Sequence, residues 1–293
     1  MQKSSTKERM IYGTLLGLFC AVCIIPIISI VSISLSSEKT LIVEGYSLLP
    51  RGFSLDAYSY VLKDLKRIMR AYGVSIFVTV TGTALGLLLN SMFAYVLSRP
   101  HYRFRSKLTV YLTIPMVLNG GLVPTYMLIT QYLHLKNNLL VLILPLAVVP
   151  WYIIMLRTFF TQIPYELSEA ATIDGASEFR IYWQIVLPLA KPALATVGIF
   201  LALAYWNDWY YPMLYIENSN LVNLQYMLYR MMREVQELTR NVAASGMTAG
   251  VANLPTESMR MAMCVMAAGP MLVVFPFFQK YFVKGLTIGG VKG

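Results

Sequence analysis

Long apolar runs alternate with shorter polar segments along this chain of 293 residues. Each long run reaches the length of about 20 residues that a helix needs to cross a bilayer. This pattern predicts membrane helices at about residues 11–35, 69–97, 108–129, 139–160, 192–214 and 259–278. The segments between the runs are too short for a separate soluble domain. The sequence therefore predicts an all-α polytopic membrane protein, with six transmembrane helices in a single transmembrane domain over residues 1–293.

Several runs contain residues that shape helices in lipid. The first run is longer than the ~7–15-residue apolar core of a signal peptide, so we expect an uncleaved helix. "NGGLVP", residues 119–124, interrupts the third run, and Pro145 and Pro150 lie in the fourth. Small residues allow neighbouring helix backbones to approach closely in a membrane. In the second run these include Gly73, Gly82 and Gly86.

Composition supports the membrane assignment and suggests an orientation. Hydrophobic residues make up 57% of the chain and charged residues 13%, against ~25% charged in soluble domains. The net charge is +10, with short basic elements at residues 1–9, 99–107 and 280–292. The positive-inside rule places short basic elements in the cytoplasm, although the outer segments hold a similar number of cations in long loops, where the rule is weak. We therefore expect both termini and residues 161–191 in the cytoplasm.

Cysteine and histidine content argues against a metal or disulfide framework. The three cysteines, Cys20, Cys23 and Cys264, all lie in apolar runs, and their odd number disfavours a set of disulfides. The CxxC spacing of the first two lacks further thiol or polar ligands nearby. The chain has only two histidines, and neither a basic–aromatic pattern nor a nucleic-acid module is present. We predict no metal, no cofactor and no nucleic-acid partner for this chain.

The stretch "TQIPYELSEAATIDGASEFRIYWQIVLPLAKP", residues 161–192, differs from its apolar neighbours. Pro164 suits the first turn of a helix, and acids near that start favour the helix dipole. Asp174-Gly175 is a turn signal, and a second helix is expected from about Ser177 to Leu187. The first helix, at about residues 164–174, has a small-residue face and acidic surroundings, which favours docking on a partner protein with cations. The alternative is an amphipathic connector on the membrane surface, but such connectors are usually basic.

The part "EAATIDGASEFRIYWQIVLPLAKP" resembles the EAA loop of ABC importer permeases. The pattern of that family is roughly E-A-A-x-x-D-G-A, followed after about ten residues by L-P-x-x-x-P. The matching positions are Glu169, Ala170, Ala171, Asp174, Gly175, Ala176, Leu187, Pro188 and Pro192. The whole chain is similar to the maltose-type second permease subunit of carbohydrate importers, which have the type I ABC importer fold.

The resemblance implies a set of partners and a location. These are a second homologous permease, two cytoplasmic ATPase subunits that bind ATP and Mg²⁺, and an extracytoplasmic solute-binding protein, with the chain in the bacterial cytoplasmic (inner) membrane among lipid. The EAA helix would insert into a cleft of one ATPase. The implied ATPase-coupling residues are Glu166, Glu169, Ala170, Ala171, Asp174 and Gly175. This chain has no GxxxxGK[ST] loop, so we do not expect it to be an enzyme.

Polar and aromatic residues in the spans are candidates for the substrate pathway, because polar groups in lipid are costly. These candidates are Asn119, Tyr126, Trp206, Asn207, Asp208 and Trp209. Aromatic rings stack on sugars and Asn207 would hydrogen-bond their hydroxyls. An interfacial aromatic belt with a hydrated acid is the alternative for Trp206 to Trp209, and it is the one that the sequence favours.

The resemblance implies a carbohydrate cargo, an oligosaccharide in the branch that "NGGLVP" and "AYWNDWYYPM" resemble. Arginines in the last outer segment suggest an acidic, alginate-type uronate chain, although Glu234 and Glu237 lie among them. These arginines are Arg230, Arg233, Arg240 and Arg260. An ion-coupled secondary transporter of a small polar solute is the alternative function. It would usually show inverted repeats and a mid-membrane acid, and the sequence shows neither.

Overall fold

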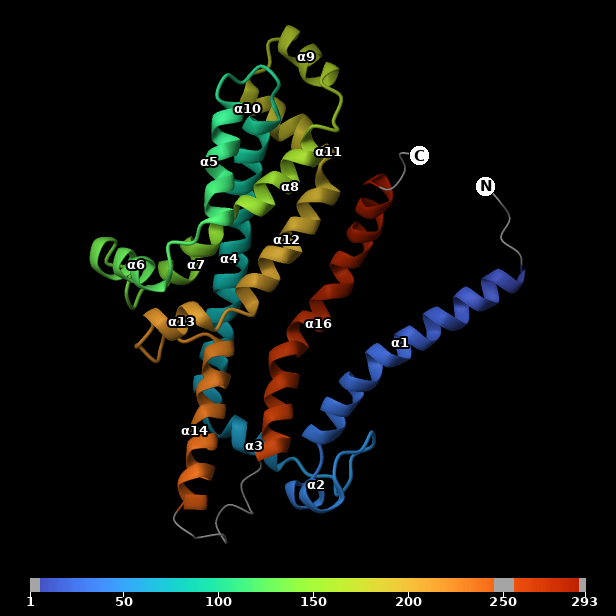
Figure 1. Ribbon diagram of the computed structural model, residues 1–293, viewed down its shortest axis with the longest axis vertical. Coiled ribbons are helices and arrows are strands. Elements are labelled where there is room, and N and C mark those ends of the chain that lie inside the picture. The colour runs from blue at the N-terminus through green and yellow to red at the C-terminus, as the bar shows by residue number, and fades with distance from the viewer. Residues whose placement is uncertain (1–5, 245–255, 290–293) are drawn as a thin grey trace. The chain divides into compact units, whose positions relative to one another are not determined.

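The computed structural model describes residues 6–244 and 256–289, and over these residues it is built from helices without any strand (Figure 1). Its chain divides into two compact units. One comprises Met1–Ile68 with Leu228–Pro270, and the other comprises Met69–Met227 with Met271–Gly293. The single transmembrane domain expected from the sequence stays a prediction.

Among the described residues, three uninterrupted stretches are long and apolar enough to cross a membrane. They lie in α1 (Thr6–Ser34), in the continuous helix formed by α3 (Asp56–Val61), η1 (Leu62–Asp64) and α4 (Leu65–Ser98), and in α16 (Thr256–Gly289). Helix α16 is longer at both ends than the predicted 259–278. The candidate span inside it covers Thr256–Val274.

Three further candidates are pairs of helices that bend sharply at a short break. The first joins α5 (Arg105–Val117) to α6 (Leu122–Met127) and η2 (Leu128–Tyr132) at 111°. The second joins α7 (Leu140–Ala147) to α8 (Pro150–Phe160) at 48°. The third joins α10 (Glu178–Ile181), η3 (Tyr182–Val186) and α11 (Leu187–Leu189) to α12 (Lys191–Trp206) at 83°. Counting each pair as one span gives up to six spans.

The first two breaks have visible causes in the sequence. Gly121 has a φ of +85°, a conformation that favours glycine, and its amide donates to Asn119 Oδ1 at 2.9 Å. This is the interruption expected from "NGGLVP". The predicted continuous helix over 139–160 is wrong in its middle, where Val148 and Val149 are extended. The residue before a proline avoids the helical region, and Pro150 follows directly.

The predicted fifth helix, 192–214, is also wrong at its end. Helix α12 stops at Trp206, and a separate short helix, α13 (Tyr210–Tyr215), follows. The Asp208 carboxylate accepts hydrogen bonds from the amides of Tyr210 (3.0 Å) and Tyr211 (3.1 Å). A carboxylate that satisfies the first free amides of a helix acts as its N-terminal cap. Asp208 therefore starts a new helix where the aromatic composition suggested continuation.

Two polar segments that the sequence left without structure contain helices. Helix α2 (Glu38–Glu44) follows α1, and α14 (Leu224–Ala244) precedes the last span. In α14, Leu228 and Val235 are buried whereas Glu234 is exposed. Apolar residues recurring at such helical intervals mark an amphipathic helix.

In the second unit, α4 supplies the polar groups that the broken span needs. The buried Asn90 amide donates to the carbonyl of Ala147 at 2.8 Å and accepts from the amide of Val149 at 3.0 Å. Both backbone groups lose helical partners at the α7–α8 break. Unsatisfied backbone groups are expensive in lipid. Asn90, a buried polar residue inside α4, is therefore explained as a structural residue.

In the first unit, the buried carboxylate of Glu38 holds the start of α16. Its Oε1 accepts from Thr256 Oγ1 (2.9 Å) and from the amide of Glu257 (3.0 Å). Its Oε2 accepts from the amide (3.0 Å) and hydroxyl (2.8 Å) of Ser258. A carboxylate at a helix N-terminus satisfies free amides and favours the helix dipole. Glu38 thus connects α2 to α16.

Substituting Glu38 with alanine is expected to destabilise the protein by about 2 kcal/mol, because buried donors at the start of α16 lose their acceptor. Thermal unfolding of the purified protein in detergent measures this as a lower midpoint. Glu44→Ala is the control on the same helix. Glu44 pairs with Arg51 at 3.3 Å, and both side chains are about half exposed, so we expect less than about 1 kcal/mol. Equal shifts for both variants would contradict the role of Glu38.

Candidate functional site

Residues 166–176, the part of the chain that contains Glu166, Glu169 and Asp174, form a short helix that ends in a glycine turn. Helix α9 spans Glu166–Ile173, with Glu166 and Glu169 in its first turn. At its end the amide of Ala176 donates to the carbonyl of Ala171 at 2.9 Å, and that of Gly175 to Thr172 at 3.0 Å. Gly175 has a φ of +79°. This pair of bonds around a left-handed residue is the Schellman motif, so Gly175 allows the chain to reverse after α9.

Most of α9 is exposed. Its acidic residues at 166 and 169 and the following Asp174 all face solvent, as does Ala170. Ile173 is 83% exposed, although it is apolar. On the opposite face Ser168 is buried. The helix therefore presents acids and an apolar side chain together, a combination that suits a protein surface better than water alone.

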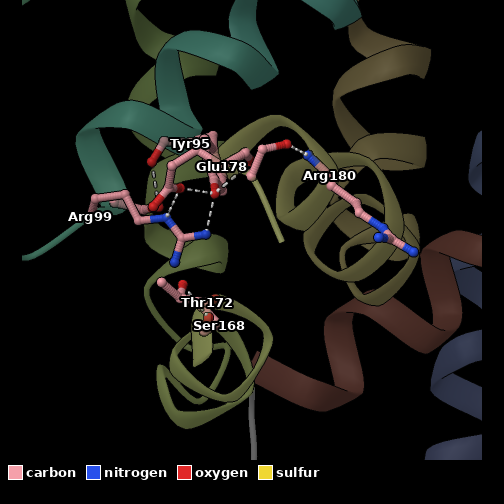
Figure 2. A network of polar contacts seen from close by, with 8 residues as sticks. Tyr95, Arg99, Ser168, Thr172, Glu178 and Arg180 are labelled. Carbon is pink, nitrogen blue, oxygen red and sulfur yellow. Dashed lines mark hydrogen bonds and ion pairs between the residues drawn. The ribbon is translucent and has the colours of Figure 1, made fainter. Parts of the chain in front are cut away.

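The segment after α9 is attached to α4 by two side chains of that helix and by Arg99, which directly follows its last residue. Ser91, Tyr95 and Arg99 recur at intervals of four, which places them in one row. The Ser91 and Tyr182 hydroxyls share a hydrogen bond of 2.8 Å. The Tyr95 hydroxyl donates to Glu178 Oε2 at 2.5 Å, and Arg99 Nε lies 3.6 Å from the same oxygen. Figure 2 shows Tyr95, Arg99 and Glu178 pointing toward one another.

A polar cavity of about 240 Å³ adjoins this network. Arg99, Arg105, Thr161, Tyr165 and Ser168 are among its lining residues. The cavity therefore lies between the connection from α4 to α5 and the start of α9. This cavity could not be predicted from the sequence, because its lining residues come from separate segments at 98–105, 160–168 and 186.

The predicted pathway residues fall in two places in the second unit. Asn207, Asp208 and Trp209 form the break between α12 and α13, and Trp206 ends α12. Trp206 is 4% exposed and Trp209 is 41% exposed. Asn207 Oδ1 accepts a hydrogen bond of 3.5 Å from Gln225. Asp208 serves as the cap of α13 described above.

Tyr126 belongs to the same neighbourhood. Its ring stacks on that of Tyr215 in α13, with centroids 5.5 Å apart and planes inclined by 16°. Tyr215 in turn stacks on Tyr211 at 6.2 Å and 20°. The sequence prediction missed Tyr211, which lies in the quoted aromatic segment, and Tyr215, which lies two residues beyond it. Asn119 is instead engaged in the turn at Gly121, at the α5–α6 break.

A charged contact holds two loops together next to α13. Lys136 Nζ lies 2.6 Å from Glu217 Oε1, and the bond from this ammonium lowers the pKa of the Glu217 carboxyl. Asn137 has a φ of +57°, and its Oδ1 accepts from the amides of Glu217 (2.6 Å) and Asn218 (3.0 Å). The loop after η2 therefore positions the chain that leaves α13.

In the first unit, two of the outer arginines line a cavity of about 450 Å³ between α14 and α16. Arg240 and Arg260 share it with Thr239 and Thr256. Arg260 pairs with Glu257 at 3.2 Å. Arg233 is directed elsewhere, with its guanidinium 5.9 Å from the Tyr229 ring centroid.

The sequence matches a known family over most of its length. Residues 82–288 fit the family model described as "binding-protein-dependent transport system inner membrane component". The chain belongs to this family. The resemblance inferred from the EAA-type motif is thereby confirmed, and the chain is a permease subunit of an ABC importer.

Full-length relatives agree with this assignment. The permease is 40% identical to protein LplC of Bacillus subtilis over 278 aligned residues. The alignment covers 95% of this chain and 92% of that protein. It is 36% identical to the polygalacturonan/rhamnogalacturonan transport system permease protein YtcP of B. subtilis, over 99% of this chain and 100% of that protein. A crystal structure of a bacterial ABC transporter involved in the import of the acidic polysaccharide alginate contains a similar chain. That chain has a TM-score of 0.78 and 30% identity, with 96% of this chain and 100% of that one covered.

The described residues of this permease contain no cluster of metal-binding side chains and no disulfide. Within residues 6–244 and 256–289 no group of three or more His, Cys, Asp or Glu could hold a metal ion. Cys20, Cys23 and Cys264 are unpaired and exposed. The expectation that this chain binds no cofactor stays a prediction.

Proposed function

We propose that this permease imports an oligosaccharide that carries carboxylates, such as an oligomer of uronic acids. The observation that carries the proposal is the full-length similarity to a permease named for polygalacturonan and to a chain of an alginate importer. Both polymers consist of uronic acid units. The arginines Arg240 and Arg260, which line a cavity with threonine hydroxyls, support an anionic cargo, because guanidinium groups match carboxylates geometrically.

The chain would cross the membrane six times if each bent pair forms one span. The side on which α9 lies follows from its neighbours. The ring of Tyr165, just before α9, is 5.8 Å from that of His101 in the basic connection between α4 and α5. Figure 1 accordingly shows α9 beyond the end of α4 at which this connection begins. Short basic connections stay in the cytoplasm, so residues 161–191 would lie there too. The predicted cytoplasmic termini lie outside the described residues.

In this arrangement α9 docks on one of two cytoplasmic ATPase subunits, which bind ATP and Mg²⁺. A second, homologous permease completes the pathway, and an extracytoplasmic binding protein delivers the cargo. Glu166, Glu169, Ala170, Ala171, Asp174 and Gly175 form the docking segment. Its exposed acids and the exposed Ile173 support docking on a surface with cations and an apolar recess.

The cargo would pass the aromatic residues near α13. The stacked rings of Tyr126, Tyr215 and Tyr211 support this, since aromatic faces stack on sugar rings. Trp209, which is 41% exposed, and the amide of Asn207 extend the same surface. Trp206 is almost fully buried and fits a supporting role better than direct contact. Asn119 belongs to the α5–α6 turn, where it holds the break open.

Uptake by the reconstituted importer tests the proposal. Proteoliposomes that contain both permeases, the ATPase subunits and the binding protein are offered a labelled oligogalacturonate. The matched control is the same oligomer with its carboxyl groups reduced to alcohols. We expect ATP-dependent uptake of the acidic oligomer to exceed that of the reduced one at least about tenfold, which is the worth of one strong charged hydrogen bond. Equal uptake of both would refute the acidic cargo, and uptake driven by an ion gradient without ATP would refute the importer.

A further inference from the structure

We infer that Arg99, directly after α4, is a positioning residue that holds both ends of residues 165–178, called the α9 segment below, against α4. Movement of α9 would then be transmitted to α4 through this side chain. The inference rests on the proposed coupling role of α9 and adds the residue through which coupling enters the membrane part. Glu178 and Tyr95 complete the contact, which is called the Arg99 network below (Figure 2).

At the C-terminal end of the α9 segment, the network binds Glu178, the first residue of α10. Glu178 Oε2 accepts from the Tyr95 hydroxyl at 2.5 Å, and the same hydroxyl lies 3.2 Å from the Glu178 carbonyl oxygen. Arg99 Nη2 donates to the Tyr95 hydroxyl oxygen, and Nε lies 3.6 Å from Oε2. Tyr95 thus passes a hydrogen bond from the cation to the carboxylate, an arrangement in which each bond strengthens the next.

At the N-terminal end of the segment, Arg99 lies close to Tyr165, the residue directly before α9. Its guanidinium carbon is 4.2 Å from the centroid of the Tyr95 ring and 6.0 Å from that of the Tyr165 ring. Cations over aromatic faces within about 6 Å are attracted by the ring. Arg99 also lines the polar cavity together with Ser168, the buried residue of α9. The Arg99 side chain therefore lies close to the first residue of the segment, to its buried Ser168 and to its last residue.

The ion pair alone would not secure this geometry. The Glu178 side chain is 70% exposed, and exposed pairs contribute little. Arg99, however, is only 16% exposed, and its ring contacts do not depend on Glu178. Arg180 on α10 does not replace it, because its Nε donates to Gln184 at 2.9 Å instead. The network is specific because one partly buried cation contacts Tyr95, the residue before α9 and the first residue of α10.

Helix α4 is suited to carry the movement further. It is one helix of 34 residues without an internal proline. Its Asn90 binds the α7–α8 break, and its Gly82 faces Tyr205 of α12. A shift at Arg99 would therefore reach two broken spans. Proximity along a helix is not itself evidence of coupling, so the experiment must measure coupling directly.

The test compares Arg99→Gln with Arg103→Gln in the reconstituted importer. Arg103 lies in the same connection, and its guanidinium is 5.9 Å from the Phe104 ring. For Arg99→Gln we expect the ATPase subunits to stay bound while uptake per ATP hydrolysed falls at least about fivefold, the scale of coupling between contacting residues. Arg103→Gln should match the unmodified protein.

Glu178→Gln provides a second test should Arg99→Gln fold poorly, because Glu178 is a largely exposed residue. Its uptake per ATP should also fall. Unchanged uptake per ATP in both variants would overturn the role of Arg99. Glu169→Lys on α9 separates this failure from that of the proposed function. If Glu169→Lys loses the ATPase while the Arg99 variant behaves normally, only the positioning role fails; if Glu169→Lys is also normal, the coupling role of α9 fails.

Discussion

Glu169→Lys is expected to release the ATPase subunits from the permease and to reduce uptake about 100-fold. Glu169 lies in the exposed first turn of α9, where an acid is favoured by the helix dipole and available to a partner cation. A lysine there places like charges at a docked interface, and losing one charged contact at an interface costs about 3 kcal/mol. Purification through a tag on the permease, followed by quantification of bound ATPase, measures the effect.

Two variants control for other effects of the charge change. Glu169→Gln removes the charge but keeps the shape, so we expect a smaller loss. Glu234→Lys makes the same reversal on the exposed face of α14 and should leave the amount of bound ATPase unchanged. Because Glu169 is exposed, thermal unfolding of Glu169→Lys should match the unmodified chain. Normal ATPase binding and uptake in Glu169→Lys would show that α9 does not couple the two subunits.

Much of the α9 segment was predictable because its signals are local. A proline before the first turn and an Asp-Gly pair after the last define the ends of a helix through backbone geometry alone. The positive φ of Gly175 and the bonds around it follow from that pair. The break at "NGGLVP" was predictable for the same reason. In each case glycine or proline acts on its own neighbours, so no knowledge of the fold is needed.

The contacts of α4 could not be predicted in this way. From the sequence, Tyr95 belongs to the end of a membrane helix and Arg99 to the start of a basic loop. No sequence signal near either residue indicates that it contacts Glu178. Their spacing of four places them on one face, but the partner is brought there by the fold. The end of α12 was missed for a different reason. Because the residues around Asp208 are aromatic, the apolar run continued past it in the sequence. The role of Asp208 as the cap of α13 was therefore not recognised.

Gly82→Ala is expected to destabilise the second unit by about 2–3 kcal/mol, more than the ~1 kcal/mol that alanine gains over glycine inside a helix. A Cβ at position 82 would lie 2.5 Å from Cζ of Tyr205 and 2.7 Å from both Cε atoms. The Tyr205 ring cannot move aside freely, because the residue is 1% exposed and its hydroxyl donates to the carbonyl of Ile143 at 2.7 Å. Thermal unfolding in detergent and the yield of assembled complex measure the loss.

Gly73→Ala, on the same helix, is the matched control. A Cβ at position 73 would meet no atom within 4 Å beyond the adjoining residues and backbone of its own helix, so this variant should be neutral or slightly stabilising. Tyr205→Leu then decides the cause of the Gly82→Ala effect. Leucine removes the ring atoms that the new methyl group would meet, so Tyr205→Leu should cost less in the Gly82→Ala background than alone. If the two effects simply add, the loss in Gly82→Ala does not arise from the ring, and close approach of α4 and α12 is not what glycine provides at position 82.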